Sequence, residues 1–117
     1  MSVRHFFIFT HDSIGVGEDG PTHQPIEQLS TFRAMPNFYT FRPADGNENA
    51  ASWQAALNLN APSAFVLSRQ GLEPLAKGEF GEVSNGAYLL SSAKEAKITF
   101  IASGSEVSLC VKAAALL

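Results

Sequence analysis

The chain has 117 residues, of which 45% are hydrophobic, and a formal net charge of −3 with only eight Lys and Arg residues. These values are ordinary for one small globular domain, and the scattered basic residues form no stripe for a phosphate backbone, which argues against a nucleic acid partner. The apolar runs are too short for a membrane-spanning helix of roughly 20 residues or for a secretory signal, so we expect a cytoplasmic protein without a membrane contact.

Apolar, β-rich stretches alternate with helical patterns along the chain. This alternation predicts an α/β fold, an open and mostly parallel sheet with flanking helices. The continuous apolar run Phe6–Phe9 suits a strand that is covered on both faces. Thr22 is placed to cap a helix that continues to about Arg33 and ends before Pro36, and a second strand is expected over residues 38–41.

The next segment predicts a helix followed by a third strand. Asp45 with Glu48 three residues later resembles a capping box, so a helix is expected from there to about Leu59. Trp53 keeps helical spacing with the apolar residues around it, which favours a place in the core over a platform for a ligand. The third strand is expected over residues 63–67.

Residues 72–85 differ in character from the rest of the chain. They hold Pro74 and two glycines without a sustained hydrophobic period, which is typical of a linker. We therefore predict a first domain at residues 1–71, a linker at 72–85 and the beginning of a second domain at 86–117. In that last part, strands are expected at residues 87–90 and 97–102, followed by a helix that Ser105 caps and that runs to the last residue.

Polar residues follow each of the first three predicted strands. His11, Arg42 and Arg69 come at their carboxyl ends, which lie at one edge of a parallel sheet, where ligands of open α/β sheets bind. The planar fork of Arg69 suits a phosphate or carboxylate ligand, and equally a salt bridge to a neighbouring carboxylate. For Arg42, followed directly by Pro43, we favour a structural role.

Residues 10–25 have the composition of a binding site for a small polar ligand. They combine two histidines with three acidic residues and three glycines, which supply proton donors, acceptors and a sharply turning backbone. The G-x-G-x-x-G pattern at residues 15–20 is not read as a dinucleotide site, because it begins well past the strand and carries two acidic residues. His11 and His23 lack metal-ligand spacing, so no metal site is predicted, and each could equally be a surface or capping residue.

Four segments in order resemble one enzyme family. THDSIGVGEDGPTHQP at residues 10–25, FRPADGNE at 41–48, LSRQGL at 67–72 and IASGSEVSL at 101–109 are similar to successive segments of the transketolases. They correspond to the later part of that family's pyrimidine-binding domain and to the start of its C-terminal domain. The resemblance implies the thiamine diphosphate-binding pyrimidine-domain fold, incomplete in this chain.

The resemblance also implies an activity and a set of roles. Transketolases of the pentose phosphate pathway transfer a two-carbon ketol unit from a ketose phosphate to an aldose phosphate. His11 would contact the C1 hydroxyl and carbonyl region of the donor, and Asp19 would read the configuration of the C2 hydroxyl. His23 would lie beside the aminopyrimidine of the cofactor and the substrate and assist proton transfers, which makes His23 and His11 the catalytic candidates. Arg69 would bind the sugar phosphate.

The implied cofactors are thiamine diphosphate and a divalent metal such as Mg²⁺, and the implied partners are sugar phosphates, the remaining transketolase domains and a second copy in a homodimer. The family's pyrimidine-stacking aromatics, activating glutamate and metal site have no counterpart in this sequence, so we expect neither cofactor binding nor turnover by this chain alone. Two alternatives stay open: another thiamine diphosphate enzyme such as a dihydroxyacetone synthase, and a non-catalytic dimerisation or interaction module.

Overall fold

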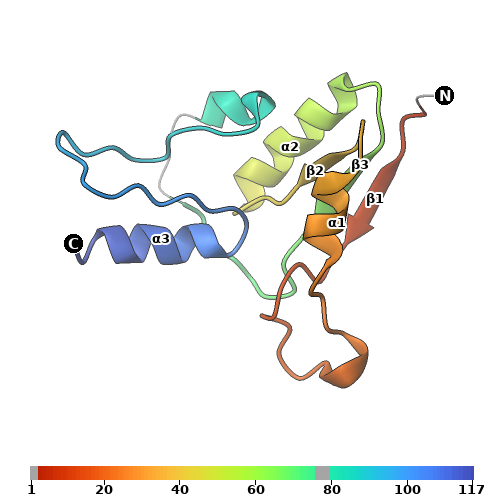
Figure 1. Cartoon of the computed structure of the whole chain (residues 1–117), viewed down its shortest axis with the longest axis horizontal. Coiled ribbons are helices and arrows are strands. Elements are labelled where there is room, and N and C mark those ends of the chain that lie inside the picture. The colour runs from red at the N-terminus through yellow and green to blue at the C-terminus, as the bar shows by residue number, and fades with distance from the viewer. Residues whose placement is uncertain (1–2, 76–79) are drawn as a thin grey trace.

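A computed structural model describes residues 3–75 and 80–117 of the chain. Its three strands form one parallel sheet in the order β1-β3-β2, which confirms the predicted α/β fold (Figure 1). The elements in chain order are β1 (Phe6–Phe9), the 3₁₀ turn η1 (Gly20–Thr22), α1 (Gln28–Ala34), β2 (Tyr39–Phe41), α2 (Gly46–Asn58), β3 (Ser63–Val66), the 3₁₀ turn η2 (Phe80–Asn85) and α3 (Glu106–Ala114).

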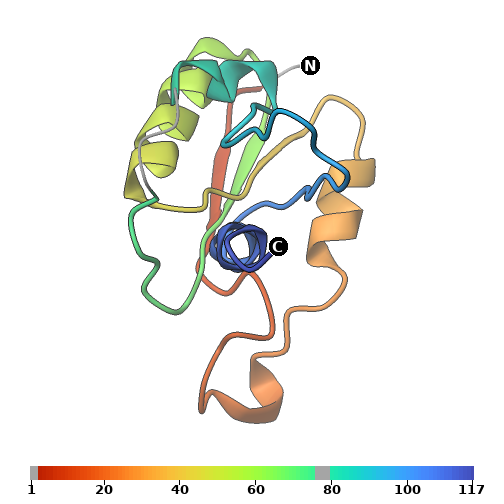
Figure 2. The same ribbon diagram turned by 90° about the vertical axis from the view of Figure 1, so that its left-hand side faces the viewer.

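The two helices between the strands cover opposite faces of the sheet (Figure 2). Phe32 of α1 packs on Phe9 of β1, with ring centroids 5.0 Å apart. On the other face, Trp53 of α2 packs on Phe6 of β1 at 5.3 Å. Phe6 and Phe9 lie three residues apart in β1, so their side chains point to opposite faces of the sheet. These two contacts therefore show that α1 and α2 lie on different faces.

The core is centred on β3, whose four residues are all buried. Phe65 stacks on Trp53 with ring centroids 4.0 Å apart and on Phe41 of β2 at 5.2 Å. The packing of Trp53 against the sheet is therefore confirmed. The continuous burial of β3 is what a central parallel strand with a helix on each face requires.

The predicted burial of β1 on both faces is wrong. Ile8 is 56% exposed, and Phe7 and Phe9 are exposed as well. The reason is position in the sheet: β1 lies at its edge and β3 takes the centre. An apolar run of this kind indicates a strand, but it does not tell an edge strand from a central one.

The first helix begins later than predicted. Residues 23–26 are not helical, and α1 starts at Gln28 instead of following directly on Thr22. Pro25 explains this difference, since a proline disfavours the helical conformation in the residue before it. Thr22 is not a helix cap, and its hydroxyl group is hydrogen-bonded to the ring of His23.

The predicted cap of α2 is confirmed. Asp45 Oδ1 accepts a hydrogen bond from the backbone N–H of Glu48 at 2.8 Å. The Glu48 carboxylate accepts from the N–H of Ala44, one residue before the cap, where a capping box would have the N–H of the cap residue itself. Tyr88 donates to the same carboxylate at 3.2 Å, and burial together with the Glu48 charge raises the pKa of Tyr88 to about 12.

The strands predicted at residues 87–90 and 97–102 are absent. A strand forms only where its backbone pairs with a neighbour, and these residues do not join the described sheet of β1, β3 and β2. Ile101 is consequently 94% exposed. Ser105 stands at the start of α3 but donates its hydroxyl to Glu106 and makes no side-chain cap, and α3 ends at Ala114. No described helix is long and apolar enough to cross a membrane.

The chain is more open than a compact domain of its length. Its Cα radius of gyration is 15.2 Å, whereas about 13 Å is expected for a compact chain. None of the described residues of α3 is fully buried, and Cys110 on this helix is half-buried. Apolar side chains on β1, on residues 98–101 and on α3 therefore remain exposed.

Candidate functional site

The parallel sheet brings the three predicted strand ends to one edge. β1 and β2 both pair with β3 in parallel, so the residues that follow each strand emerge on the same side. His11 follows β1, Arg42 follows β2, and Arg69 comes shortly after β3. The segment between β1 and α1, which holds η1, extends beyond this edge (Figure 1).

The structure places His11, Asp19, His23 and Arg69 together, and we call these four residues the His–Asp–Arg cluster. The rings of His11 and His23 have centroids 5.1 Å apart. Asp19 Oδ2 lies 3.6 Å from His11 Nε2 and 3.5 Å from Arg69 Nε. Four residues that the sequence singled out from two separate segments, residues 10–25 and 67–72, thus form one polar group.

Asp19 carries the open acceptor of this cluster. Its Oδ2 atom is buried and has no hydrogen-bond partner among the described residues. Arg69 Nε at 3.5 Å and His11 Nε2 at 3.6 Å are near enough for electrostatic attraction but too distant for a good hydrogen bond. Since buried polar atoms are normally paired, this oxygen is suited to accept a hydrogen bond from a ligand hydroxyl group.

Each histidine of the cluster is held by the threonine before it. Thr10 Oγ1 lies 3.1 Å from Nδ1 of His11, and Thr22 Oγ1 lies 2.8 Å from Nδ1 of His23. The Nε2 atoms are left for other groups, and that of His11 faces the Asp19 carboxylate, an arrangement that favours the proton on Nε2. We did not predict these threonines from the sequence, although the repeated Thr-His dipeptide is a signal for them.

The two arginines at this edge differ in environment. Arg69 forms the salt bridge to a neighbouring carboxylate that was one of its two alternatives, with Nε 3.5 Å from Asp19 Oδ2, and its side chain remains 54% exposed. The side chain of Arg42 is only 8% exposed and is paired with Asp12 and Glu106. The structural role predicted for Arg42 is confirmed.

The glycines of residues 15–20 do not form a dinucleotide fold. Gly17 and Gly20 have φ values of 70° and 72°, which side-chain-bearing residues rarely adopt, and the segment leads into a 3₁₀ turn with Pro21 instead of a helix. In residues 3–75 and 80–117, no group of three or more His, Cys, Asp or Glu side chains lies close enough together to hold a metal ion.

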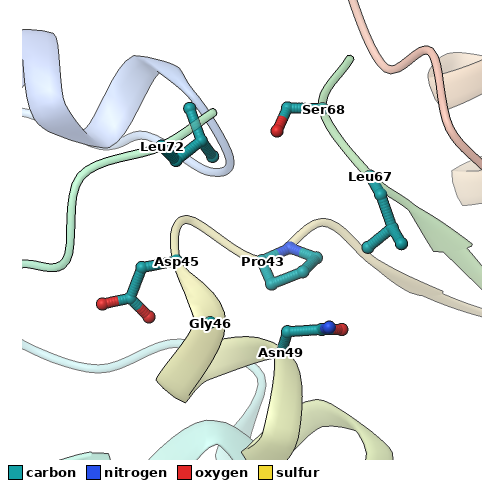
Figure 3. Close-up of a pocket in the computed structure, with 7 residues that line it drawn as sticks. All are labelled: Pro43, Asp45, Gly46, Asn49, Leu67, Ser68 and Leu72. Atoms are coloured by element: carbon teal, nitrogen blue, oxygen red, sulfur yellow. The ribbon is translucent and has the colours of Figure 1, made fainter. Parts of the chain in front are cut away.

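A small open pocket lies at the same edge of the sheet, beside the first turn of α2 (Figure 3). Its volume is about 200 Å³, and no member of the His–Asp–Arg cluster lines it. The lining residues are Pro43, Asp45, Gly46, Asn49, Leu67, Ser68 and Leu72. We place the site at the cluster instead, because the cluster combines an unpaired buried acceptor with two imidazoles and a guanidinium group.

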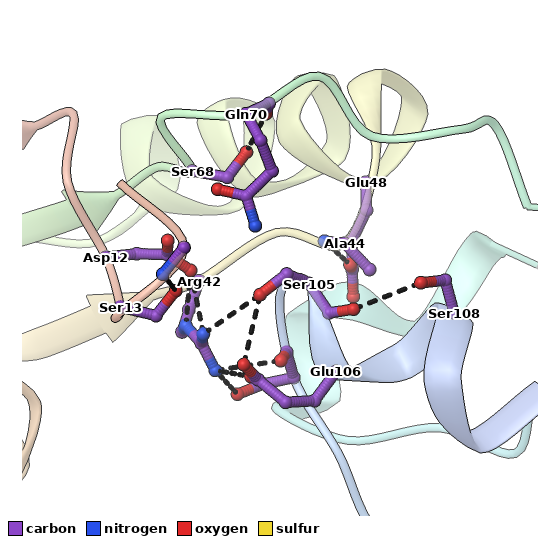
Figure 4. A network of polar contacts seen from close by, with 12 residues as sticks. Asp12, Ser13, Arg42, Ala44, Glu48, Ser68, Gln70, Ser105, Glu106 and Ser108 are labelled. Carbon is purple, nitrogen blue, oxygen red and sulfur yellow. Dashed lines mark hydrogen bonds and ion pairs between the residues drawn. The ribbon is translucent and has the colours of Figure 1, made fainter. Parts of the chain in front are cut away.

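Arg42 joins residues 10–25, which we call the site segment, to the beginning of α3 (Figure 4). Its guanidinium group donates to Asp12 on one side and to Glu106 on the other. Burial acts to lower the pKa of Arg42, but its hydrogen bonds to Glu106 and Asp12 outweigh that effect and raise it. The Glu106 pKa lies below its ordinary value, mainly because Arg42 donates a hydrogen bond to the carboxylate.

The lowered pKa of Glu106 predicts an acid-sensitive contribution to stability. A carboxyl group with a folded-state pKa below its unfolded value stabilises the fold above the unfolded pKa, and this contribution is lost as the pH falls through the folded-state pKa. We therefore expect Glu106→Gln to lower the free energy of unfolding at pH 7 and to have a smaller effect below the ordinary pKa of 4.5, where the contribution of this carboxylate is being lost. Urea denaturation at pH 7 and pH 3 measures this difference.

Glu73→Gln is the matched control for that measurement, because Glu73 is highly exposed and its pair with Lys112 is long, at 3.9 Å. It is expected to change stability little at either pH. An equal loss of stability for Glu106→Gln at both values would contradict the assignment.

The comparisons with known proteins agree with one another. The family described as "Transketolase, pyrimidine binding domain" matches residues 1–74. The transketolase of Halalkalibacterium halodurans is 52% identical over 119 residues, which cover 97% of this chain and 18% of that protein. A crystal structure of transketolase from Campylobacter jejuni is 73% identical, with a TM-score of 0.90 over 96% of this chain and 18% of that chain.

A third relative has a sugar phosphate bound. The Pichia stipitis transketolase in complex with sedoheptulose 7-phosphate is 49% identical and superimposes with a TM-score of 0.85, covering 92% of this chain and 16% of that chain. The chain spans about 18% of the length of the Halalkalibacterium halodurans and Bacillus subtilis transketolases. Because the family match covers more than half of the sequence, the chain belongs to the transketolase family and carries its pyrimidine-binding domain fold.

Proposed function

We propose that this chain supplies sugar-contacting side chains to the active site of a transketolase, which transfers a two-carbon ketol unit from a ketose phosphate to an aldose phosphate. The observation that carries the proposal is the His–Asp–Arg cluster, in which the buried Asp19 Oδ2 atom has no hydrogen-bond partner among the described residues. A sugar phosphate matches this group, since it offers hydroxyl donors at one end and an anion at the other.

Each side chain has a role that follows from its chemistry. His11 and His23 act as catalytic residues, presenting Nε2 to the donor hydroxyl and carbonyl groups, where an imidazole can both donate and accept a proton near neutral pH. Asp19 accepts a sugar hydroxyl and so discriminates against an epimer that would leave this oxygen unpaired. The exposed fork of Arg69 binds the phosphate.

The described residues fit the cofactor only in part. Thiamine diphosphate, when bound, supplies the nucleophilic carbon to which the ketol unit is transferred. His23 suits the edge of its aminopyrimidine ring, because Thr22 takes up Nδ1 and leaves Nε2 free to face it. The described parts of the chain hold no cluster of metal ligands that could anchor the diphosphate through Mg²⁺, so other parts of the protein would provide it.

The proposal extends to the whole protein. We infer sugar phosphate substrates of the pentose phosphate pathway, a homodimer, and the domain division 1–71, linker 72–85 and 86–117. The sedoheptulose 7-phosphate complex of the Pichia stipitis enzyme supports the substrate class. A cytoplasmic location is also proposed, although one relative, the potato enzyme, is a chloroplastic form.

A chimeric enzyme tests the proposed function. In this chimera, the chain replaces the matching segment of the Campylobacter jejuni transketolase, whose 73% identity favours compatible packing. We expect the chimera to transfer ketol units from xylulose 5-phosphate to ribose 5-phosphate at a rate within about tenfold of the host, and the same chimera with His23→Ala to be slower by about 100-fold or more. A correctly folded, dimeric chimera without activity would contradict the proposal.

The chain by itself is expected to be inactive, because it lacks the groups that would form the cofactor's nucleophile. A ketol-transfer assay of the purified 117 residues with thiamine diphosphate and Mg²⁺ measures this. Turnover that depends on the cofactor would show that the division of the site proposed above is incorrect.

A further inference from the structure

We propose that Arg42 is a positioning residue for the sugar site: held by residues 103–106, it fixes Asp12 and thereby the neighbouring His11. The start of α3, far along the chain from the site segment, would then set the geometry of the site. The inference rests on the proposed function, because it concerns the same His11 that is expected to contact the donor sugar.

One side of the Arg42 guanidinium group binds Asp12, which lies in the site segment shortly after β1. Its Nε and Nη2 atoms lie 2.8 and 2.7 Å from Asp12 Oδ2. The Asp12 side chain is only 2% exposed, and its other oxygen has no hydrogen-bond partner among the described residues. Arg42 is therefore the principal contact that determines where the Asp12 carboxylate lies, and Asp12 directly follows His11 in the chain.

The other side of Arg42 is enclosed by residues 103–106. Nη1 donates to the Ser103 carbonyl oxygen at 2.9 Å and to the Glu106 carboxylate, and Nη2 donates to Ser105 Oγ at 3.4 Å (Figure 4). In return, the backbone N–H of Gly104 donates to the Arg42 carbonyl oxygen at 3.0 Å. The guanidinium fork is thus clamped between the site segment and the start of α3.

Gly104 fits this clamp in two ways. Its φ of 60° lies in the left-handed region, which favours glycine. A Cβ atom at this position would lie 2.8 Å from Arg42 Nε and 2.9 Å from Arg42 Cγ and Cζ. Because these atoms belong to the buried, doubly paired part of the side chain, a Gly104→Ala side chain would push Arg42 away from its place between Asp12 and Glu106.

Arg42 bridges two carboxylates from segments far apart in sequence. The five N–H donors of its planar guanidinium group allow it to hold both in a fixed relative position. A lysine has a single point charge in place of the planar fork and cannot hold both carboxylates in the same geometry. Arg42→Lys is thus expected to keep the charge and to lose the positioning.

The test uses Arg42→Lys, Gly104→Ala and Glu106→Gln, with Arg33→Lys as the matched control. Arg33 also donates to Ser103, at 3.3 Å, but it is exposed and lies on α1. In the chimera, we expect each of the three variants to raise KM for the donor sugar about tenfold with a smaller change in kcat, because a displaced His11 weakens sugar binding. Arg33→Lys should leave both constants unchanged.

A loss of folded enzyme would lower kcat at unchanged KM, and that result in all three variants would overturn the proposal. A second readout does not depend on activity: the ring-proton NMR signals of His11 in the chain itself should shift in Glu106→Gln and not in Arg33→Lys. Unchanged His11 signals in a folded Glu106→Gln chain would also overturn it. If the unsubstituted chimera is inactive, the proposed function fails, while the His11 signals still decide the positioning role.

Discussion

Asp19→Ala is expected to lower kcat/KM of the chimera for ribose 5-phosphate by about 100-fold, which corresponds to roughly 2.7 kcal/mol of lost transition-state stabilisation. The reason is the Oδ2 atom between His11 and Arg69, which has no hydrogen-bond partner among the described residues and offers an acceptor to a sugar hydroxyl. A site built to bind a hydroxyl discriminates strongly against ligands that leave its polar groups unpaired. The preference for ribose 5-phosphate over its C2 epimer arabinose 5-phosphate should therefore shrink in this variant. Steady-state kinetics with both aldoses measure it.

Glu18→Ala provides the control, because Glu18 is the exposed carboxylate next to Asp19 and its loss removes the same charge from the same segment. It should alter kcat/KM by less than about threefold, as expected for the screened charge of a surface residue. If both substitutions had equal effects, or if Asp19→Ala kept the full preference between the epimers, the role of Asp19 as a hydroxyl acceptor would be wrong.

Phe65→Ala is expected to lower the free energy of unfolding by about 4 kcal/mol, since removal of a buried phenylalanine costs roughly 3–5 kcal/mol. Phe65 is fully buried at the centre of β3 and contacts the rings of Trp53 and Phe41. Both faces of the small core depend on this strand. Such a loss is a large share of the stability of any small domain. Urea denaturation followed by circular dichroism and by the fluorescence of Trp53, the single tryptophan, measures it.

Phe100→Ala is the matched control for Phe65→Ala. Phe100 is 44% exposed and lies in the segment that forms no strand. Its removal should cost clearly less than that of Phe65, because Phe100 leaves nearly half of its surface in solvent and so buries less apolar area. Comparable losses in the two variants would mean that the core is not centred on β3.

Local pattern and turn chemistry predicted the first two thirds of the fold. The apolar runs located all three strands to within a residue, and the Asp45 cap located the start of α2. Pro25 delays the start of α1 to Gln28, an effect of local sequence that the predicted helix start at Thr22 did not include. The exposure of β1 and the missing strands at 87–90 and 97–102 depend on which segments pair in the sheet and in what order, which a local pattern does not contain.

The residues of the His–Asp–Arg cluster could be predicted from the sequence, whereas the residues that pair with Arg42 could not. The parallel sheet explains why His11 and Arg69 lie at the same edge, where both are near Asp19, since the ends of parallel strands share one edge. The position of Asp19 and His23 came from the family resemblance and not from spacing. Asp12 and Glu106 were not singled out, because their pairing with Arg42 joins residues from three distant segments and has no local signature. The same holds for Gly104: the reason why a side chain does not fit at this position is its closeness to Arg42, which only the structure shows.

A crystal structure of the chimera with a ketose phosphate bound tests the central claim most directly. We predict sugar hydroxyl or carbonyl oxygens within hydrogen-bond distance of Nε2 of His11 and His23, a sugar hydroxyl on the Asp19 carboxylate, and the phosphate on Arg69. A sugar phosphate bound in the active site without contacts to the His–Asp–Arg cluster would contradict the proposed role of this chain.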